Sequence, residues 1–159
     1  MVTIKNIVVP TDFSEAASHA LDYALSLAKT FQAKIYLMHV FEPIVYYSDA
    51  PMGMPDLIEL EQNVRGVAEQ SLQSILDKQI KEHETEFGTI PVETILAQGK
   101  PFIEIIQTAK EKNADLIVLS THGRSALEHI LLGSVTEKVV RKAHCPVLTI
   151  RSTTVFKMP

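Results

Sequence analysis

The chain is predicted to fold as a doubly wound α/β domain, in which helices cover both faces of a five-stranded parallel sheet. Short apolar runs alternate five times with segments whose apolar residues recur at helical spacing. This alternation favours parallel strands joined by crossover helices. The chain has 159 residues, of which 46% are apolar, and this is the size and composition of one domain with one core. No segment repeats and no linker divides the chain, so we expect one domain over residues 1–159.

The first half of the chain contains two predicted strands and two predicted helices. Ser14 has the side chain of an N-cap and directly precedes the first helix. Three prolines and one glycine mark the segment after the second strand as a loop. An apolar stripe from Leu57 to Ile80 recurs at helical spacing and predicts one long second helix. The elements are, in order, a strand over Ile4–Val9, a helix over Glu15–Phe31, a strand over Lys34–Val40, a loop over Glu42–Pro55 and a helix over about Asp56–Glu84.

The second half continues the alternation with three strands and two helices. Pro101 suits the first turn of a helix, where its missing N–H costs nothing. Ser134 and Glu137 have the spacing of a capping box at the start of another helix. The elements are, in order, a strand over Val92–Ala97, a helix beginning at Pro101, a strand over Leu116–Leu119, a helix over Ser134–Ala143 and a strand over Val147–Ile150.

Charge and composition exclude several classes of protein. The formal net charge is −4 and no basic run occurs, which argues against a nucleic-acid partner. No apolar stretch has the length that spans a membrane, and the first residues lack the pattern of a signal peptide. Cys145 is the single cysteine, so no internal disulfide framework is expected. We therefore expect a soluble cytoplasmic protein with neither a nucleic-acid nor a membrane partner.

One segment of the sequence has the features of an anion-binding site. The apolar run Ala114–Leu119 leads into Ser120-Thr121-His122-Gly123-Arg124, and Gly133-Ser134 follows at the start of a predicted helix. Backbone N–H groups at a glycine turn and the positive end of a helix dipole both favour an anion such as a phosphate. Glycine also lets the main chain come close to a ligand, because it has no Cβ. The segment therefore predicts nucleotide binding at the end of a buried strand.

The spacing of the glycines resembles one family in particular. Neither the P-loop motif nor the G-x-G-x-x-G motif occurs in the chain. Gly123, nine further residues and Gly133-Ser134 instead resemble the signature G-x-x-G-x9-G-[ST] of the universal stress protein family, in its ATP-binding branch. The resemblance extends from Ile7–Asp12 to Cys145–Ile150. Ser120 stands where the signature has its first glycine, and its hydroxyl could donate a hydrogen bond to a phosphate or ribose oxygen.

The resemblance implies a strand order of 3-2-1-4-5 and a ligand between the first and fourth strands, where the order reverses. Asp12, with its two preceding residues, would then lie near the adenine and the ribose, and Val40 would contact the base. The ribose and phosphates would be held by residues after the fourth strand, with His122 and Arg124 beside the phosphates. The implied binding residues are Pro10, Thr11, Asp12, Val40, Leu119, Ser120, His122, Gly123, Arg124, Gly133, Ser134, Val135 and Thr136.

Structural roles remain open for several of these residues. Asp12 could shape an Asx turn between the strand and the helix, since Thr-Asp-Phe-Ser is typical of turns. Ser134 could serve only as a helix cap. Gly123 and Gly133 could be ordinary turn glycines.

The resemblance implies the function of an ATP-binding regulatory protein in stress responses, which acts through dimer and partner contacts. AMP or ADP could replace ATP, and magnesium would arrive with the nucleotide rather than at a dedicated metal site. The resemblance implies a homodimer through the last strand, Val147–Ile150. One alternative is a slow ATP hydrolase, with Asp12 and Ser134 near a metal ion and His122 as the base. Another alternative is a dimeric scaffold that binds no nucleotide.

Overall fold

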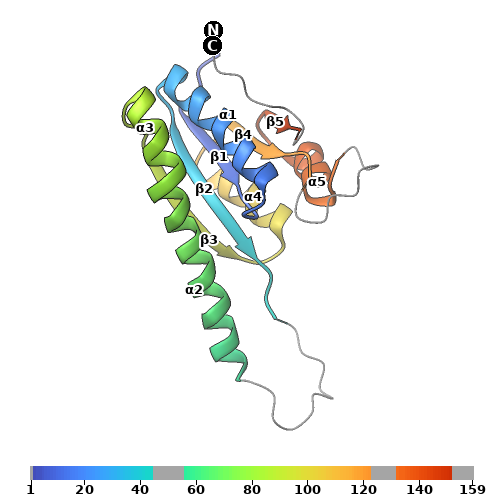
Figure 1. The fold of residues 1–159 in the computed structure, drawn as a ribbon. Coiled ribbons are helices and arrows are strands. Elements are labelled where there is room, and N and C mark those ends of the chain that lie inside the picture. Colours follow the sequence, from blue (N-terminus) through green and yellow to red (C-terminus); the bar gives the residue numbers. More distant parts are fainter. Residues whose placement is uncertain (1, 45–55, 123–131, 152–159) are drawn as a thin grey trace.

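The computed structural model describes residues 2–44, 56–122 and 132–151 of the chain. Five strands in these residues pair in parallel and form one sheet in the order β3-β2-β1-β4-β5 (Figure 1). The predicted sheet and its implied strand order are therefore confirmed. The strands are β1 (Asn6–Pro10), β2 (Lys34–Phe41), β3 (Val92–Gln98), β4 (Leu116–Ser120) and β5 (Val147–Ile150).

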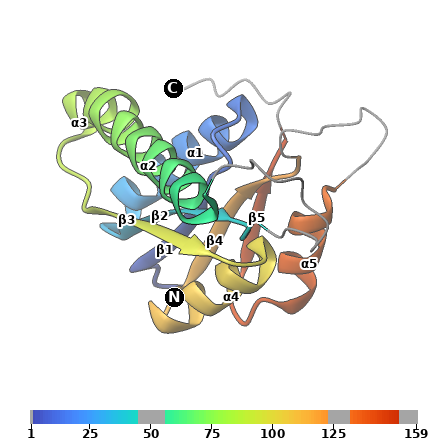
Figure 2. The same cartoon turned by 90° about the horizontal axis from the view of Figure 1, so that it is seen from below.

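Helices cover both faces of this sheet, as predicted. Figure 2 shows α1, α2 and α3 on one side of the sheet and α4 and α5 on the other. The helices are α1 (Glu15–Phe31), α2 (Leu57–Ile75), the π-helical turn η1 (Leu76–Ile80), α3 (Lys81–Phe87), α4 (Pro101–Glu111) and α5 (Ser134–Lys142).

The core is divided by the sheet because neighbouring residues of a strand point to opposite faces. Ile7 and Val9 of β1 pack in the cluster that contains the buried face of α1. Val8, between them, packs in the other cluster with Ile105 of α4 and Val139 of α5. All three β1 residues are fully buried, so the strand is apolar on both faces as a central parallel strand should be.

The bounds of β1 and the start of α1 follow from local hydrogen bonds. β1 begins at Asn6 rather than at the predicted Ile4. The N–H groups of Lys5 and Asn6 both donate to Asp115 Oδ2, at 2.8 and 3.0 Å, and this fixes the chain as it enters the sheet. Ser14 caps α1 as predicted, because Ala17 N–H donates to its Oγ at 3.2 Å.

The prediction of one unbroken helix after the loop is wrong, because the π-helical turn η1 separates α2 from α3. Leu72 and Ile80 are both buried in the same core cluster. At 3.6 residues per turn, eight residues would place Ile80 about 80° away from Leu72 around the helix axis. The wider π turn takes up one extra residue and reduces this offset to about 20°. The wider turn thus returns Ile80 to the core.

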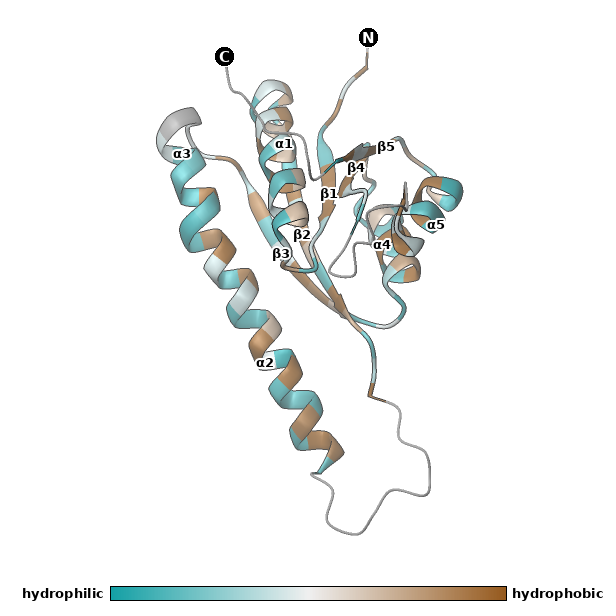
Figure 3. Cartoon of the chain, turned by 45° about the vertical axis from the view of Figure 1, so that its right-hand side comes forward, coloured by the Kyte–Doolittle hydropathy of each residue, from teal (hydrophilic) through white to brown (hydrophobic). Residues whose placement is uncertain are grey.

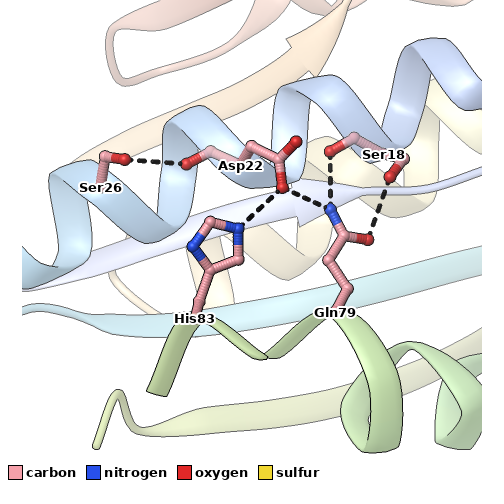
Figure 4. Close-up of polar contacts among 5 residues, drawn as sticks. All are labelled: Ser18, Asp22, Ser26, Gln79 and His83. Atoms are coloured by element: carbon pink, nitrogen blue, oxygen red, sulfur yellow. Dashed lines mark hydrogen bonds and ion pairs between the residues drawn. The ribbon is translucent and has the colours of Figure 1, made fainter. Parts of the chain in front are cut away.

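Side chains between η1, α3 and α1 hold this turn in place (Figure 4). Gln79 Nε2 donates to Ser18 O at 3.0 Å and to Asp22 Oδ1 at 2.7 Å. Ser18 Oγ donates to Gln79 Oε1 at 3.1 Å. His83 Nε2 lies 3.0 Å from the same Asp22 oxygen and must donate, because a carboxylate oxygen only accepts. One glutamine and one histidine therefore attach the π turn to α1.

The first half of α2 extends past the end of the sheet (Figures 1 and 3). Leu57, Val64 and Val67 of the predicted apolar stripe are consequently 44%, 37% and 64% exposed. Only the second half of the stripe is buried, where α2 reaches the sheet. None of the described helices, α2 included, combines the length and the apolar character needed to cross a membrane.

A charged cluster lies where β2 and β3 pair. The Glu93 carboxylate accepts from Lys112 Nζ at 2.8 Å and from Lys34 Nζ at 2.6 Å, and both ammonium groups lie over the Tyr36 ring. The hydrogen bonds from Lys112 and then Lys34 hold the pKa of the Glu93 carboxyl below its usual range. The cluster is half-exposed and forms no part of the cavity described below.

Candidate functional site

A cavity of about 270 Å³ opens at the carboxyl ends of β1, β2 and β4, beside the first turn of α5. β1 and β4 are the neighbouring strands at which the strand order reverses, and open parallel sheets bind ligands at this point. Gly123 and Arg124, two of the thirteen predicted binding residues, lie outside the described residues. The other eleven all line this cavity: Pro10, Thr11, Asp12, Val40, Leu119, Ser120, His122, Gly133, Ser134, Val135 and Thr136.

The turn between β1 and α1 forms one wall of the cavity. Asp12 Oδ1 accepts from Ser14 N–H at 3.0 Å and from Ser14 Oγ at 2.5 Å, which confirms the Asx-turn interpretation of Asp12. Phe13 adopts φ 64°, a backbone conformation that is rare for a non-glycine residue. Its N–H donates to Thr11 Oγ1 at 3.1 Å. Asp12 is thus held in a fixed turn and also lines the cavity.

His39 at the end of β2 supports the same turn. Its Nδ1 lies 2.8 Å from the Thr11 carbonyl oxygen, so Nδ1 carries the proton and donates it. Its ring lies 4.3 Å from the Phe13 ring between centroids, which helps to keep Phe13 in its unusual conformation. Thr11 N–H donates to Met38 O at 2.8 Å. Residues of β2 are therefore bonded to both the N–H and the carbonyl oxygen of Thr11 in the β1–α1 turn.

Sequence reasoning missed five lining residues. His39 and Met38 directly precede the predicted Val40, so their position at the end of a strand next to β1 was a usable signal. The remaining three lie on helices, and only the packing of those helices brings them to the cavity. The five are Ala17, Met38, His39, Pro101 and Ile105.

The wall between β4 and α5 is closed by hydrogen bonds within the chain. Ser120 Oγ donates to His122 O at 2.7 Å, and Thr136 Oγ1 donates to Ser120 O at 2.9 Å. Gly133 N–H donates to Thr121 O at 2.7 Å. The Ser120 proton, which we expected to be available for a ligand oxygen, is therefore used inside the turn.

The predicted capping box at α5 is wrong. The helix begins at Ser134, and Gly133 is its N-cap residue, in an extended conformation with φ −65° and without a capping side chain. Glu137 is bonded by Arg141, at 3.2 Å, on the exposed side of the helix. The N-cap residue therefore provides no capping side chain, and the first-turn N–H groups of α5 and the positive end of its dipole are at the cavity wall.

Gly133 is needed for space rather than for its backbone angles. A Cβ at this position would lie 3.3 Å from Thr121 O, closer than side-chain carbons normally approach. The glycine therefore permits the close contact between the end of β4 and the start of α5.

The charges around the cavity are distributed unevenly. Asp12 is the only carboxylate among the described lining residues, and these include no lysine or arginine. The first turn of α5 attracts negative groups, whereas Asp12 favours groups that donate hydrogen bonds. Within the described residues no three His, Cys, Asp or Glu side chains are placed to hold a metal ion. The cavity therefore suits a polar ligand with an anionic end at α5 and hydrogen-bond donors elsewhere.

A second cavity, of about 230 Å³, lies between α1 and the α2–η1 segment. Thr11 is the only predicted binding residue among those that line it. The predicted residues are thus gathered in the first cavity and are not spread over both.

The comparison with known proteins agrees with the fold. Residues 3–151 match the model of the universal stress protein family. The chain belongs to the universal stress protein family. The universal stress protein MJ0531 of Methanocaldococcus jannaschii is 36% identical over 147 residues, covering 92% of this chain and 82% of that protein. The universal stress protein YxiE of Bacillus subtilis is 36% identical over 146 residues, covering 91% of this chain and 97% of that protein.

Solved universal stress proteins share the same architecture. The chain is similar to UspA from Lactobacillus plantarum, with a TM-score of 0.80 and 29% identity over 95% of this chain and 100% of that chain. A universal stress protein solved in complex with cAMP has a TM-score of 0.64 and 22% identity, over 95% and 99% of the two chains. One from Archaeoglobus fulgidus, solved in complex with dAMP, has a TM-score of 0.58 and 21% identity, over 94% and 98%. The last two likenesses show the fold alone.

Proposed function

We propose that this universal stress protein binds an adenine nucleotide, ATP first among them, in the cavity between β1, β4 and α5. The observation that carries the proposal is that eleven predicted binding residues line one cavity whose wall includes the start of α5, where the N-cap residue Gly133 has no capping side chain. A helix start of this kind binds phosphate groups through its backbone N–H groups and its dipole. We retain residues 1–159 as one nucleotide-binding domain and a cytoplasmic location as parts of the proposal.

The proposed orientation of the nucleotide follows from the charges. Its phosphates would lie at Ser134, Val135 and Thr136 in the first turn of α5. Its base would lie toward Asp12 and Val40, with the sugar between the base and that turn, because a carboxylate repels phosphates and accepts from hydroxyl or amino groups. Magnesium would be held mainly by the phosphates and water, with the Ser134 hydroxyl on the phosphate side of the cavity, because this ion usually keeps several waters.

Related proteins support the class of ligand. Relatives of the same fold were solved with cAMP and with dAMP, and both ligands contain adenine and a phosphate. These proteins are only distantly similar to this chain, so their ligands indicate which compounds to test first.

Regulation by nucleotide binding is preferred to hydrolysis. Efficient phosphoryl transfer needs an oriented water and a well-held metal ion. Asp12, the only described carboxylate of the cavity, already accepts two hydrogen bonds from Ser14. We therefore propose that the bound nucleotide changes dimer and partner contacts in stress responses, rather than serving as a substrate for rapid turnover.

The test of this proposal is a calorimetric titration of nucleotide-free protein with Mg-ATP, beside Ser134→Asp and Ser134→Ala. An aspartate at the first position of α5 interacts favourably with the helix dipole, so the variant should stay folded. At about 5 Å and an effective dielectric constant of about 20, it would repel each phosphate charge by about 3 kcal/mol. ATP affinity should therefore fall at least about 100-fold in Ser134→Asp and far less in Ser134→Ala. No binding by the parent protein, or equal binding by all three, would refute the proposal.

We propose further that two copies pair through β5, which lies at an edge of the sheet. Ile117 N–H donates to Pro146 O and Thr121 N–H donates to Ile150 O, so the alternate residue Thr149 directs its N–H to the open side. Thr149→Pro removes this outward donor and leaves the bonds to β4 in place. Sedimentation analysis should show a dimer for the parent and for Thr149→Val, and a weakened dimer for Thr149→Pro. A monomeric parent at micromolar concentration would rule out the dimer.

A further inference from the structure

Ser120, which occupies the position of the first glycine in the family signature, lines the cavity, and its hydroxyl has already used its proton. The Ser120 Oγ donates to the carbonyl oxygen of His122 at 2.7 Å. A hydroxyl has one proton and two lone pairs, so this oxygen can only accept a further hydrogen bond. A phosphoryl oxygen, which also only accepts, is therefore an unfavourable neighbour for Ser120.

The other donors of this wall are used in the same way. The Thr136 hydroxyl donates to the Ser120 carbonyl at 2.9 Å, and Gly133 N–H donates to the Thr121 carbonyl at 2.7 Å. The donors that this leaves for an anion on the described part of this wall include the first-turn N–H groups of α5 and the Ser134 hydroxyl. The cavity consequently separates an anion end, at α5, from an accepting end that includes Ser120.

We propose that Ser120 Oγ accepts a hydrogen bond from a ribose hydroxyl of the bound nucleotide and thereby favours nucleotides that carry that hydroxyl. This assignment rests on the proposed nucleotide binding. A nucleotide has two kinds of donor that could meet Ser120, the hydroxyls of its sugar and the amino group of its base. Ser120 is bonded to Thr136 in the first turn of α5, where the phosphates would lie. The sugar is bonded directly to the phosphate, whereas the amino group is at the far end of the nucleotide, so the sugar is the group that reaches Ser120.

The experiment measures affinities for ATP, 2′-deoxy-ATP and 3′-deoxy-ATP by calorimetry. The parent should bind ATP about fivefold more tightly than at least one deoxy analogue, the factor expected of one neutral hydrogen bond. Ser120→Ala removes the hydroxyl and keeps the Cβ, and Ser120→Gly restores the family residue. Both variants should bind ATP and that analogue equally. Ser134→Ala is the matched control, because it removes another lining hydroxyl and should leave the ratio of the two affinities unchanged.

Each other outcome overturns the assignment in a recognisable way. If Ser120→Ala weakens ATP and both analogues by the same factor, Ser120 acts only by holding the turn through His122. If only Ser120→Gly binds ATP, Ser120 prevents nucleotide binding and does not accept a hydrogen bond from the ribose. If the parent binds all three nucleotides equally, the proposed nucleotide binding is supported and the proposed hydrogen bond from the ribose to Ser120 is refuted. If neither the parent nor any variant binds a nucleotide, the proposed function falls as well.

Discussion

Replacing Gln79 by glutamate should destabilise the protein in a way that depends strongly on pH. In the parent, Gln79 Nε2 donates to Ser18 O and, at 2.7 Å, to Asp22 Oδ1 (Figure 4). The glutamate would place a second carboxylate oxygen at that position, so two donated bonds are lost and two negative charges face each other. Gln79→Met is the reference variant, because it removes the polar contacts of Gln79 without adding a charge.

The size of the effect follows from the geometry. Two unit charges 2.7 Å apart repel by about 1.5 kcal/mol at the dielectric constant of water and by about 6 kcal/mol at an effective constant of about 20. The Asp22 side chain is 24% exposed, so about 2–3 kcal/mol is a reasonable value between these limits. The two lost hydrogen bonds add about 1 kcal/mol each. Gln79→Glu should therefore lose about 4–5 kcal/mol at pH 7, and Gln79→Met about 2–3 kcal/mol.

Lowering the pH should reverse the order of stability of Gln79→Glu and Gln79→Met. Repulsion by the neighbouring Asp22 carboxylate raises the folded-state pKa of the introduced carboxyl above the value of an unfolded carboxyl, about 4. The folded variant then binds more protons than the unfolded chain, so its stability rises as the pH falls toward that value. Once protonated, the new carboxyl can donate to Asp22, and the glutamate variant should become at least as stable as Gln79→Met below about pH 5.

Urea denaturation of both variants at pH 4.5 to 8 is the assay. A matched control is Gln73→Glu, since Gln73 Nε2 also donates to an aspartate four residues on, Asp77, but in an exposed position. Solvent screens that pair, so the control should lose much less stability and should depend less on pH. A glutamate variant as stable as the parent at pH 7, or a difference from Gln79→Met that does not change with pH, would refute the reasoning.

Three further predictions concern stability, and a fourth concerns the reactivity of a thiol. Gly66→Ala should raise the free energy of unfolding by about 1 kcal/mol, because an added Cβ inside α2 meets nothing within 4 Å. Gly133→Ala should instead lower it by about 1 kcal/mol, because its Cβ would crowd Thr121 O, and urea denaturation of both variants checks the opposite signs. Glu93→Gln should be less stable than the parent at pH 7, because it loses the ion pairs with Lys112 and Lys34. Denaturation curves should show this stability difference shrinking once the pH falls below about 4.3, the pKa of an unfolded glutamate, and disappearing as the pH passes the lowered folded-state pKa of Glu93. Burial raises the pKa of the Cys145 thiol, so it should react with a thiol reagent at pH 8 more slowly than free cysteine does, and an equal rate would contradict this.

The sequence by itself determined the architecture and the position of the candidate site. Short continuous apolar runs such as Ile7–Val9 indicate strands that are buried on both faces, and helices of ordinary length are recognised by the spacing of their apolar residues. Parallel strands end at the same edge of a sheet, so polar residues after two neighbouring strands, Asp12 and Ser120, had to come together once the strand order was known. That order itself came from the family resemblance.

Only the tertiary structure decided the details that depend on partners distant in the chain. The π turn at Gln79 exists because its side chain is bonded to Asp22, 57 residues earlier, and because Ile80 must return to the core. Likewise, Gly133 replaces Ser134 as the cap of α5 because its N–H donates to Thr121 at the end of β4. Local propensity is a weak preference of about 1 kcal/mol or less per residue, so such long-range contacts override it.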